Sequence, residues 1–283
     1  QPEESEEPLT LDALAFGILV HEMLQTAVSA LEANGGFGKA KPQAIENAVG
    51  EAVAAAAARW ESEQPVPPHV IWRNTLDSAR EVAARALTYH LDPLPSQKSW
   101  TEIPFGTPDR KTRNDLPWDP SSPVEIPNTG IIIQGHIDRL DLSGDDRHAR
   151  VIDYKTGRLS KKMTDVVVKG GSELQRCLYA FAVRTLLGRK VDVEASLLFP
   201  RVPEGEQALF PLHDVDSALD LLADAIAIAR ANVENGVALP GIDAGDDYND
   251  FAFALPANAS YLARKRPFAD QKMGDATNIW EAK

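Results

Sequence analysis

Two acids and a base are spaced in the sequence in a way that suits metal-dependent chemistry. Asp153 and Lys155 end the apolar segment 149–155, and on a β-strand residues two apart point to the same side. Asp138 lies in the preceding segment and would come close to Asp153 if the two segments paired across the turn SGDD. Converging carboxylates repel each other unless a cation lies between them, and Mg²⁺ and Mn²⁺ prefer oxygen ligands. Lys155 would then orient or deprotonate a water or hold a phosphate oxygen, so the set suits phosphodiester hydrolysis.

The elements that must position these residues follow from the spacing of the apolar residues. The spacing has a helical period in the first third of the chain and alternates like strands from residue 99 onwards. It predicts helices over 9–33, 42–63, 69–90, 172–188 and 214–236, and strands over 99–106, 130–142, 149–155 and 191–200. The segment 107–129, with its prolines and mixed charges, is predicted to be a loop or insertion. This order of elements predicts an α/β or α+β core preceded by helices.

The chain is long enough to bury a substantial core, with 283 residues of which 43% are apolar and 25% charged. We expect one overall domain in four parts. They are an acidic tail over 1–8, a helical region over 9–97, the core over 98–236 and a C-terminal extension over 237–283 that packs on the core.

Several classes of protein are disfavoured by the composition. No apolar run approaches the roughly 20 residues that cross a bilayer, and the start QPEESEEP is unlike a signal peptide, so we expect no membrane association and a cytoplasmic location. Cys177 is the only cysteine, which excludes an internal disulfide and disfavours zinc or iron–sulfur sites held by cysteines of this chain. Because the sequence starts at Gln1 without a methionine, we expect a fragment or a processed segment of a longer protein.

Charge is unevenly distributed along the chain. The net charge is −13, yet residues 138–190 contain 12 Lys or Arg against 7 Asp or Glu. Because nonspecific affinity for DNA comes mainly from such cations, this segment is predicted to contact phosphates. The predicted contacts are Arg139, Arg158, Lys161, Lys162, Lys169 and Arg176. For any one of them, a solvated basic loop is an equally good interpretation.

Five segments in a fixed order carry a family resemblance. They are FGILVHEML, TEIPF, GHIDRLDL, VIDYKTG and ELQRCLYAFA. Together they resemble the PD-(D/E)XK nuclease superfamily, and within it the nuclease domains of bacterial recombination helicase-nucleases of the RecB and AddB type. The resemblance covers residues 14–200, and a weaker resemblance extends to the C-terminus. It implies a restriction-endonuclease-like fold, in which helices flank a mixed central sheet, with a helical N-terminal region.

The resemblance also implies roles for individual residues. Asp138 and Asp153 would be metal ligands, Lys155 the catalytic lysine, and His21 a further metal ligand, with Gly17 one turn before it. Taken alone, His21 would more often be a hydrogen-bonded core histidine. Asp153 and Lys155, taken alone, could form a surface ion pair on an edge strand.

Three more residues have two interpretations each. Gln175 and Tyr179 match the glutamine and tyrosine of the family's following helix, and four residues apart they share one helical face. They would contact DNA or brace Lys155, or else form the polar boundary of a core helix. Glu102, in TEIPF, would add a carboxylate to the site or simply cap an exposed strand face.

The expected function is that of a metal-dependent deoxyribonuclease, exonuclease rather than endonuclease, that cuts single-stranded DNA or ends being unwound. Mg²⁺ or Mn²⁺ would be the cofactor, and a helicase domain or subunit a possible partner. No iron–sulfur cluster is expected, because the segment 246–267 lacks the cysteines that hold one in many AddB-type domains. The alternatives are a stand-alone CRISPR-associated or phage-type exonuclease of the same fold, and a non-catalytic DNA-binding or assembly module.

Overall fold

The computed structural model of the chain describes residues 9–107, 115–159, 173–188, 190–237 and 260–274. Three long helices precede the strands of the sheet in sequence, one helix lies between the fifth and sixth strands of the chain, and two helices follow the last strand. In chain order the elements are α1 (Ala13–Ala33), the 3₁₀ turn η1 (Phe37–Lys39), α2 (Pro42–Glu63), α3 (His69–Thr88), β1 (Lys98–Phe105), β2 (Val124–Ile126), β3 (Ile131–Ile133), β4 (Gly135–Leu142), β5 (His148–Tyr154), α4 (Gln175–Leu187), β6 (Asp192–Leu198), β7 (Leu209–Leu212), α5 (Val215–Glu234) and α6 (Tyr261–Met273).

A mixed five-stranded sheet forms the centre of the protein, with strand order β1-β4-β5-β6-β7. Strands β4 and β5 form the predicted antiparallel pair, and β5 and β6 run parallel. A parallel pair needs a crossover connection, and α4 provides it between β5 and β6. The predicted mixed sheet flanked by helices is therefore confirmed.

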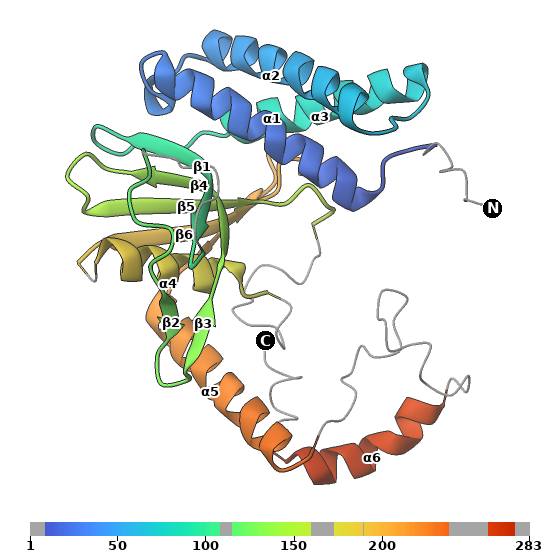
Figure 1. Ribbon diagram of the computed structural model, residues 1–283, viewed down its shortest axis with the longest axis vertical. Helices are drawn as coiled ribbons and strands as arrows, with labels where there is room; N and C mark the ends of the chain where they lie inside the picture. The colour runs from blue at the N-terminus through green and yellow to red at the C-terminus, as the bar shows by residue number, and fades with distance from the viewer. Residues whose placement is uncertain (1–8, 108–114, 160–172, 189, 238–259, 275–283) are drawn as a thin grey trace.

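Helices cover both faces of this sheet (Figure 1). On one face α1, α2 and α3 pack on Ile152, Tyr154 and Leu197. On the other face α4 packs on residues that include Leu140 and Val151. Because residues of β5 alternate between these two layers, the strand is buried on both sides, which explains its apolar sequence.

Helix α1 is the element that brings the N-terminal region onto the sheet. Its first turn is capped by Asp12, whose carboxylate accepts a hydrogen bond from the Ala15 backbone N–H at 2.7 Å. By length and composition alone α1 is apolar enough to cross a membrane, so the expectation that no segment reaches this length was wrong. One face of the helix, which includes Leu19 and Met23, is instead buried against the other helices and the sheet.

Several elements were not predicted from the sequence. Strands β2 and β3 form a separate two-stranded ribbon, and β3 is split from β4 at Gln134 within what was predicted as one strand. Gly106 lies against this break: its φ is +70°, and a Cβ there would collide with the carbonyl oxygen of Ile133, so only glycine fits. Strand β7 and helix α6 were not predicted.

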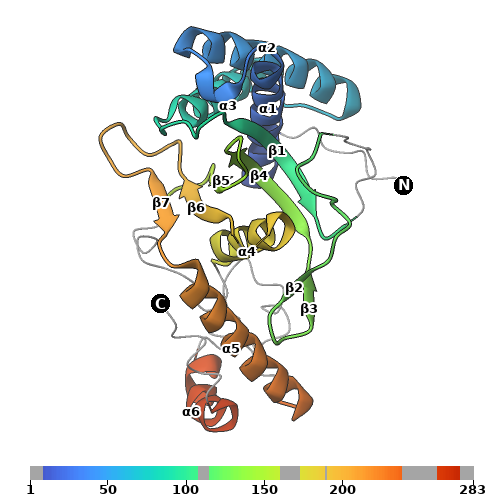
Figure 2. The same ribbon diagram turned by 90° about the vertical axis from the view of Figure 1, so that its left-hand side faces the viewer.

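The C-terminal part of the described chain leads away from the sheet. Helix α5 starts beside α4, where Ala218 and Leu222 are buried with Cys177, and then projects past the sheet (Figure 2). Helix α6 lies near the far end of α5 (Figures 1 and 2). The packing predicted for the extension 237–283 concerns mostly residues outside the described ranges and stays a prediction.

Candidate active site

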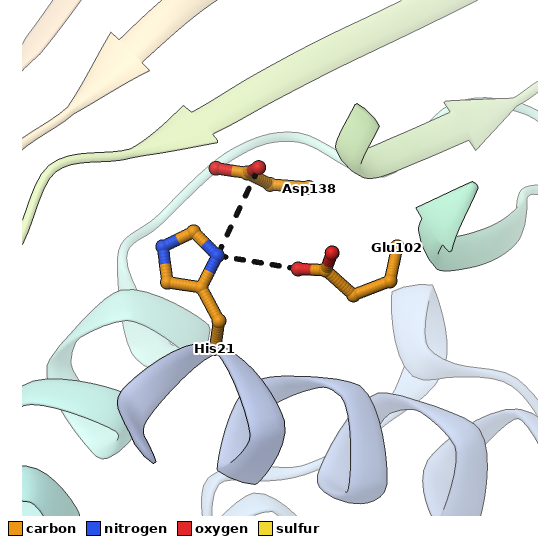
Figure 3. A group of neighbouring side chains, drawn as sticks. All are labelled: His21, Glu102 and Asp138. Carbon is orange, nitrogen blue, oxygen red and sulfur yellow. Dashed lines mark hydrogen bonds and ion pairs between the residues drawn. The ribbon is translucent and has the colours of Figure 1, made fainter. Parts of the chain in front are cut away.

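A histidine and two acids meet between α1 and the sheet (Figure 3). His21 Nδ1 lies 3.2 Å from Glu102 Oε1 and 3.8 Å from Asp138 Oδ1. Its other ring nitrogen, Nε2, lies 3.2 Å from the backbone carbonyl oxygen of Tyr154. One potential ligand atom from each of His21, Glu102 and Asp138 lies within 4.8 Å of the others, so the three could hold one metal ion. We call them the His21 cluster.

The two acids of the His21 cluster lie where the ladder between β1 and β4 is interrupted. Thr101 pairs with Arg139 and Ile103 with Ile137, whereas Glu102, between them, has a φ of +49°. This left-handed conformation is unfavourable for a residue with a side chain, and it is maintained only where the surroundings impose it. The distorted backbone carries Glu102 toward His21 (Figure 3). The structure thus favours the site interpretation of Glu102 over the strand-face interpretation.

Gly17 lets α1 approach the end of β5. A Cβ on Gly17 would lie 3.3 Å from Thr156 Oγ1, which is tighter than most real contacts. His21 is one helical turn further along α1, so any displacement of the helix moves its ring. This close approach gives a physical reason for glycine at this position.

Substitution of Gly17 should therefore damage the site more than the fold. We expect Gly17→Val to push α1 off the strand end and to reduce the deoxyribonuclease activity expected from the sequence by up to about 10²-fold. Gly50 in α2 is the matched control, because it is also helical and a Cβ there meets nothing within 4 Å. Gly50→Ala should stabilise the protein by about 0.5–1 kcal/mol in urea denaturation and leave cleavage unchanged. Equal cleavage by Gly17→Val and the native protein would contradict the explanation.

Burial and like charges perturb the acids of the site. Burial, and then the charge of Asp153, raise the pKa of Asp138 to about 7, although His21 and the Tyr154 N–H oppose the change. Burial lowers the pKa of His21, but its hydrogen bond with Glu102 and the charge of Asp138 raise it overall, to about 9. Burial also raises the pKa of Asp153, against the opposing charge of Lys155. The site thus gathers several carboxyl groups in a buried environment, which disfavours their ionised forms.

This concentration of charge predicts a pH-dependent stability. The folded pKa of Asp138, about 7, is above the unfolded value of 3.8, so its contribution to stability is present below pH 4 and is lost as the pH rises through 7. In EDTA at pH 8, Asp138→Asn should therefore be more stable than the native protein by on the order of 4 kcal/mol. The difference should shrink toward zero near pH 4 in urea denaturation at each pH. A difference that is the same at both pH values would contradict this prediction.

Asp153 and Lys155 form the second part of the site. They project from the same side of β5 as predicted, with Lys155 Nζ 2.6 Å from Asp153 Oδ2. Lys155 Nζ also donates to Gln175 Oε1, and Gln175 Nε2 donates to the Tyr179 hydroxyl at 3.4 Å. Gln175 and Tyr179 lie on α4, so this helix braces the lysine from the opposite side of the sheet from α1.

The residues present fit a divalent cation. Asp153 is 2% exposed, and its Oδ2 accepts no well-oriented hydrogen bond within the described part of the chain, although Lys155 lies beside it. Buried carboxylates whose charge is so poorly compensated are stabilised by a bound cation. The clustered ligand atoms are those of His21, Glu102 and Asp138. The role of Asp153 as a ligand stays a prediction.

The predicted phosphate contacts need correction at two positions. Arg139 and Arg176 are each 3% exposed and form ion pairs with Asp141 and Glu173, so neither is available to DNA. Arg158 is exposed just beyond Lys155 and stays a predicted contact. Lys161, Lys162 and Lys169 lie outside the described residues.

An open pocket borders the His21 cluster. Its volume is about 640 Å³, and His21, Glu102 and Thr156 line it together with Leu14 and Ile18 of α1. Leu14 and Ile18 are 75% and 53% exposed, so they present apolar surface to this pocket. The site is thus open to solvent along α1.

The fold and the site together define a class of protein. Helices flank a mixed sheet, and acids, a histidine and a lysine gather around the middle of β1 and β4 and the C-terminal end of β5, as expected of a metal-dependent nuclease. The family model for the PD-(D/E)XK nuclease superfamily matches residues 2–242, and the chain belongs to this superfamily. No curated protein sequence matches the chain closely enough to count as a relative. Membership confirms the predicted superfamily and implies a nucleic acid substrate.

Proposed function

We propose that the protein is a metal-dependent deoxyribonuclease domain of the RecB or AddB type. The observation that supports this most is the His21 cluster beside the Asp153–Lys155 pair, in a chain of the nuclease superfamily. The finer assignment rests on the order and spacing of the five sequence segments. Under this proposal the chain cuts single-stranded DNA or unwound ends, as an exonuclease rather than an endonuclease.

His21, Glu102 and Asp138 would hold the metal, joined by Asp153 on the adjacent strand. Mg²⁺ or Mn²⁺ is the proposed ion, because three of these four side chains offer carboxylate oxygens. When bound, such an ion supplies positive charge for the scissile phosphate and lowers the pKa of a bound water.

The residues of the chain itself have separate roles in this proposal. Lys155 lies at the edge of the acidic site, where its ammonium group orients the attacking water or holds a phosphate oxygen. Gln175 accepts a hydrogen bond from Lys155 and thereby limits the positions of the ammonium group. Tyr179 supports Gln175 from one helical turn away. This arrangement keeps the ammonium group of Lys155 beside the Asp153 carboxylate.

The pocket along α1 is the proposed entry for the DNA strand. It leads directly to His21 and Glu102, and its exposed apolar residues Leu14 and Ile18 suit unpaired bases better than a closed duplex. A helicase domain or subunit that delivers a separated strand is the proposed partner. A cytoplasmic location belongs to the same proposal.

Cleavage of end-labelled DNA tests the proposed function. Single-stranded and double-stranded substrates are incubated with the protein in Mg²⁺, Mn²⁺ or EDTA. We expect cleavage with either metal, none in EDTA, and faster cleavage of the single strand; the product ladder gives the polarity. Cleavage that continues in EDTA, or no cleavage with any metal, would contradict the proposal.

A further inference from the structure

Arg139 and Asp141 form a buried ion pair directly beside the candidate active site. Arg139 Nε donates to Asp141 Oδ1 at 2.8 Å and Nη2 to Oδ2 at 2.5 Å, with the two residues 3% and 0% exposed. The Ser99 hydroxyl donates to the same carboxylate at 2.7 Å. The Phe37 ring lies 4.5 Å from the guanidinium carbon. Every partner is thus fixed, and the pair is held in one geometry.

Tyr154 connects this ion pair to the metal-binding residues. Its hydroxyl accepts a hydrogen bond from Arg139 Nη1 at 3.3 Å. Its backbone N–H donates to Asp138 Oδ2 at 2.8 Å, and its carbonyl oxygen lies 3.2 Å from His21 Nε2. The Tyr154 ring also packs edge-on against the His21 ring, with centroids 6.3 Å apart. One residue therefore contacts two potential metal ligands and the buried arginine.

Stability alone gives a poor account of this arrangement. A buried ion pair loses the hydration of both charges, and replacing such a pair by apolar residues of similar volume is often neutral or stabilising. The surrounding layer is apolar, with Ile152 and Leu197 fully buried, so apolar side chains at these positions would fit it. What apolar residues could not do is hold the Tyr154 hydroxyl at a fixed point.

We propose that Arg139, Asp141 and Tyr154 are positioning residues that hold Asp138 and His21 at the spacing a divalent cation requires. The inference rests on the proposed function for the presence of the cation. Arg139 anchors the hydroxyl of Tyr154, and the Tyr154 backbone then orients one oxygen of Asp138 and one nitrogen of His21. The remaining oxygen of Asp138 and the remaining nitrogen of His21 face each other and Glu102. Outer residues of this kind typically change metal affinity by about 10–100-fold when they are removed.

Titration of Mn²⁺ alone, followed by the EPR signal of free Mn²⁺, tests the inference without any nuclease assay. The Asp138→Ala variant defines the binding that does not belong to the site. The double variant Arg139→Met/Asp141→Leu removes the ion pair without leaving an unpaired charge. We expect its Tm in EDTA to be no lower than that of the native protein and its Mn²⁺ affinity to be about 10-fold weaker. Tyr154→Phe, which removes only the hydroxyl, should weaken Mn²⁺ binding in the same direction.

A matched control separates positioning from general stability. Val49 is fully buried in α2 within the helical layer, and Val49→Ala should lower Tm but leave Mn²⁺ affinity unchanged. If the double variant does not fold, the Mn²⁺ affinity of the Tyr154→Phe variant tests the inference. Native affinity in the folded variants, or an equal loss of affinity in Val49→Ala, would overturn the inference.

The result can be separated from the outcome for the proposed function. A native protein that cuts DNA with Mn²⁺, while the variants bind Mn²⁺ equally well, would keep the function and overturn the inference. Weaker Mn²⁺ binding by the variants of a protein that cuts no DNA would support the positioning network and overturn the proposed function.

Discussion

Replacing Asp153 by asparagine is expected to reduce DNA cleavage by about 10³-fold or more, because a metal site contributes several kcal/mol to the reaction. Asp153 is 2% exposed, and its pKa is raised by burial. The folded protein therefore tolerates this charge at a cost, which is expected where charge is needed for function. Asparagine keeps the shape and removes the charge, so the metal-free protein should be at least as stable as the native one. Single-turnover cleavage and urea denaturation in EDTA measure the two effects.

The control for this prediction is Asp145→Asn. Asp145 lies in the turn between β4 and β5, with its side chain 57% exposed, and it bonds with Ser143 and the Arg147 backbone. Its replacement should leave cleavage within a few-fold of native. If the Asp153→Asn protein cleaves DNA at the native rate, the assignment of Asp153 to the active site is wrong.

The second large effect is expected from Lys155→Ala, which should lower the single-turnover rate by about 10²–10⁴-fold, the range typical of a positioned acid–base group. Lys155 is held between Asp153 and Gln175, so its ammonium group is fixed at the edge of the proposed metal site. Lys155→Arg should not restore the rate, because the planar guanidinium has a different shape. DNA affinity, measured by fluorescence anisotropy in EDTA, should change far less than the rate.

Lys98→Ala serves as the control for charge. Lys98 is an exposed cation at the start of β1, stacked over Trp100, so its loss changes the net charge by the same amount. It should leave the cleavage rate near native. If Lys155→Ala weakens DNA binding by the same factor as it lowers the rate, Lys155 is a binding residue and its proposed role in the reaction is wrong.

Strand alternation was enough to predict part of the site. It places Asp153 and Lys155 on one side of β5, away from Ile152 and Tyr154, as the structure has them. The pairing of β4 with β5 brings Asp138 beside Asp153, and a family resemblance added His21.

Glu102 could not be assigned because its position depends on a left-handed backbone in the middle of a strand. The rule that successive strand residues point to opposite faces assumes a regular backbone. It fails where a strained backbone changes the direction of a side chain.

Charge counts failed for a different reason. Arg139 and Arg176 contribute to the local excess of cations in the sequence, but each forms a buried ion pair with an acid. Composition does not distinguish a cation on the surface from one in a buried pair, and only the packing of α1 and α4 on the sheet does. Short elements such as β2 and β7 were missed because three or four residues carry too little periodicity to detect.

The His21 cluster joins segments that are far apart along the chain. His21 is 81 residues from Glu102 and 133 residues from the Tyr154 carbonyl that it contacts. Contacts of such long range form late, because the entropy of closing large loops must be overcome first. A nascent or partly folded chain therefore lacks the complete ligand set, and catalytic competence should arise only with the last cooperative step of folding. Under the proposed function, this dependence means that an incomplete chain would bind no metal at the His21 cluster and would not cut nucleic acid.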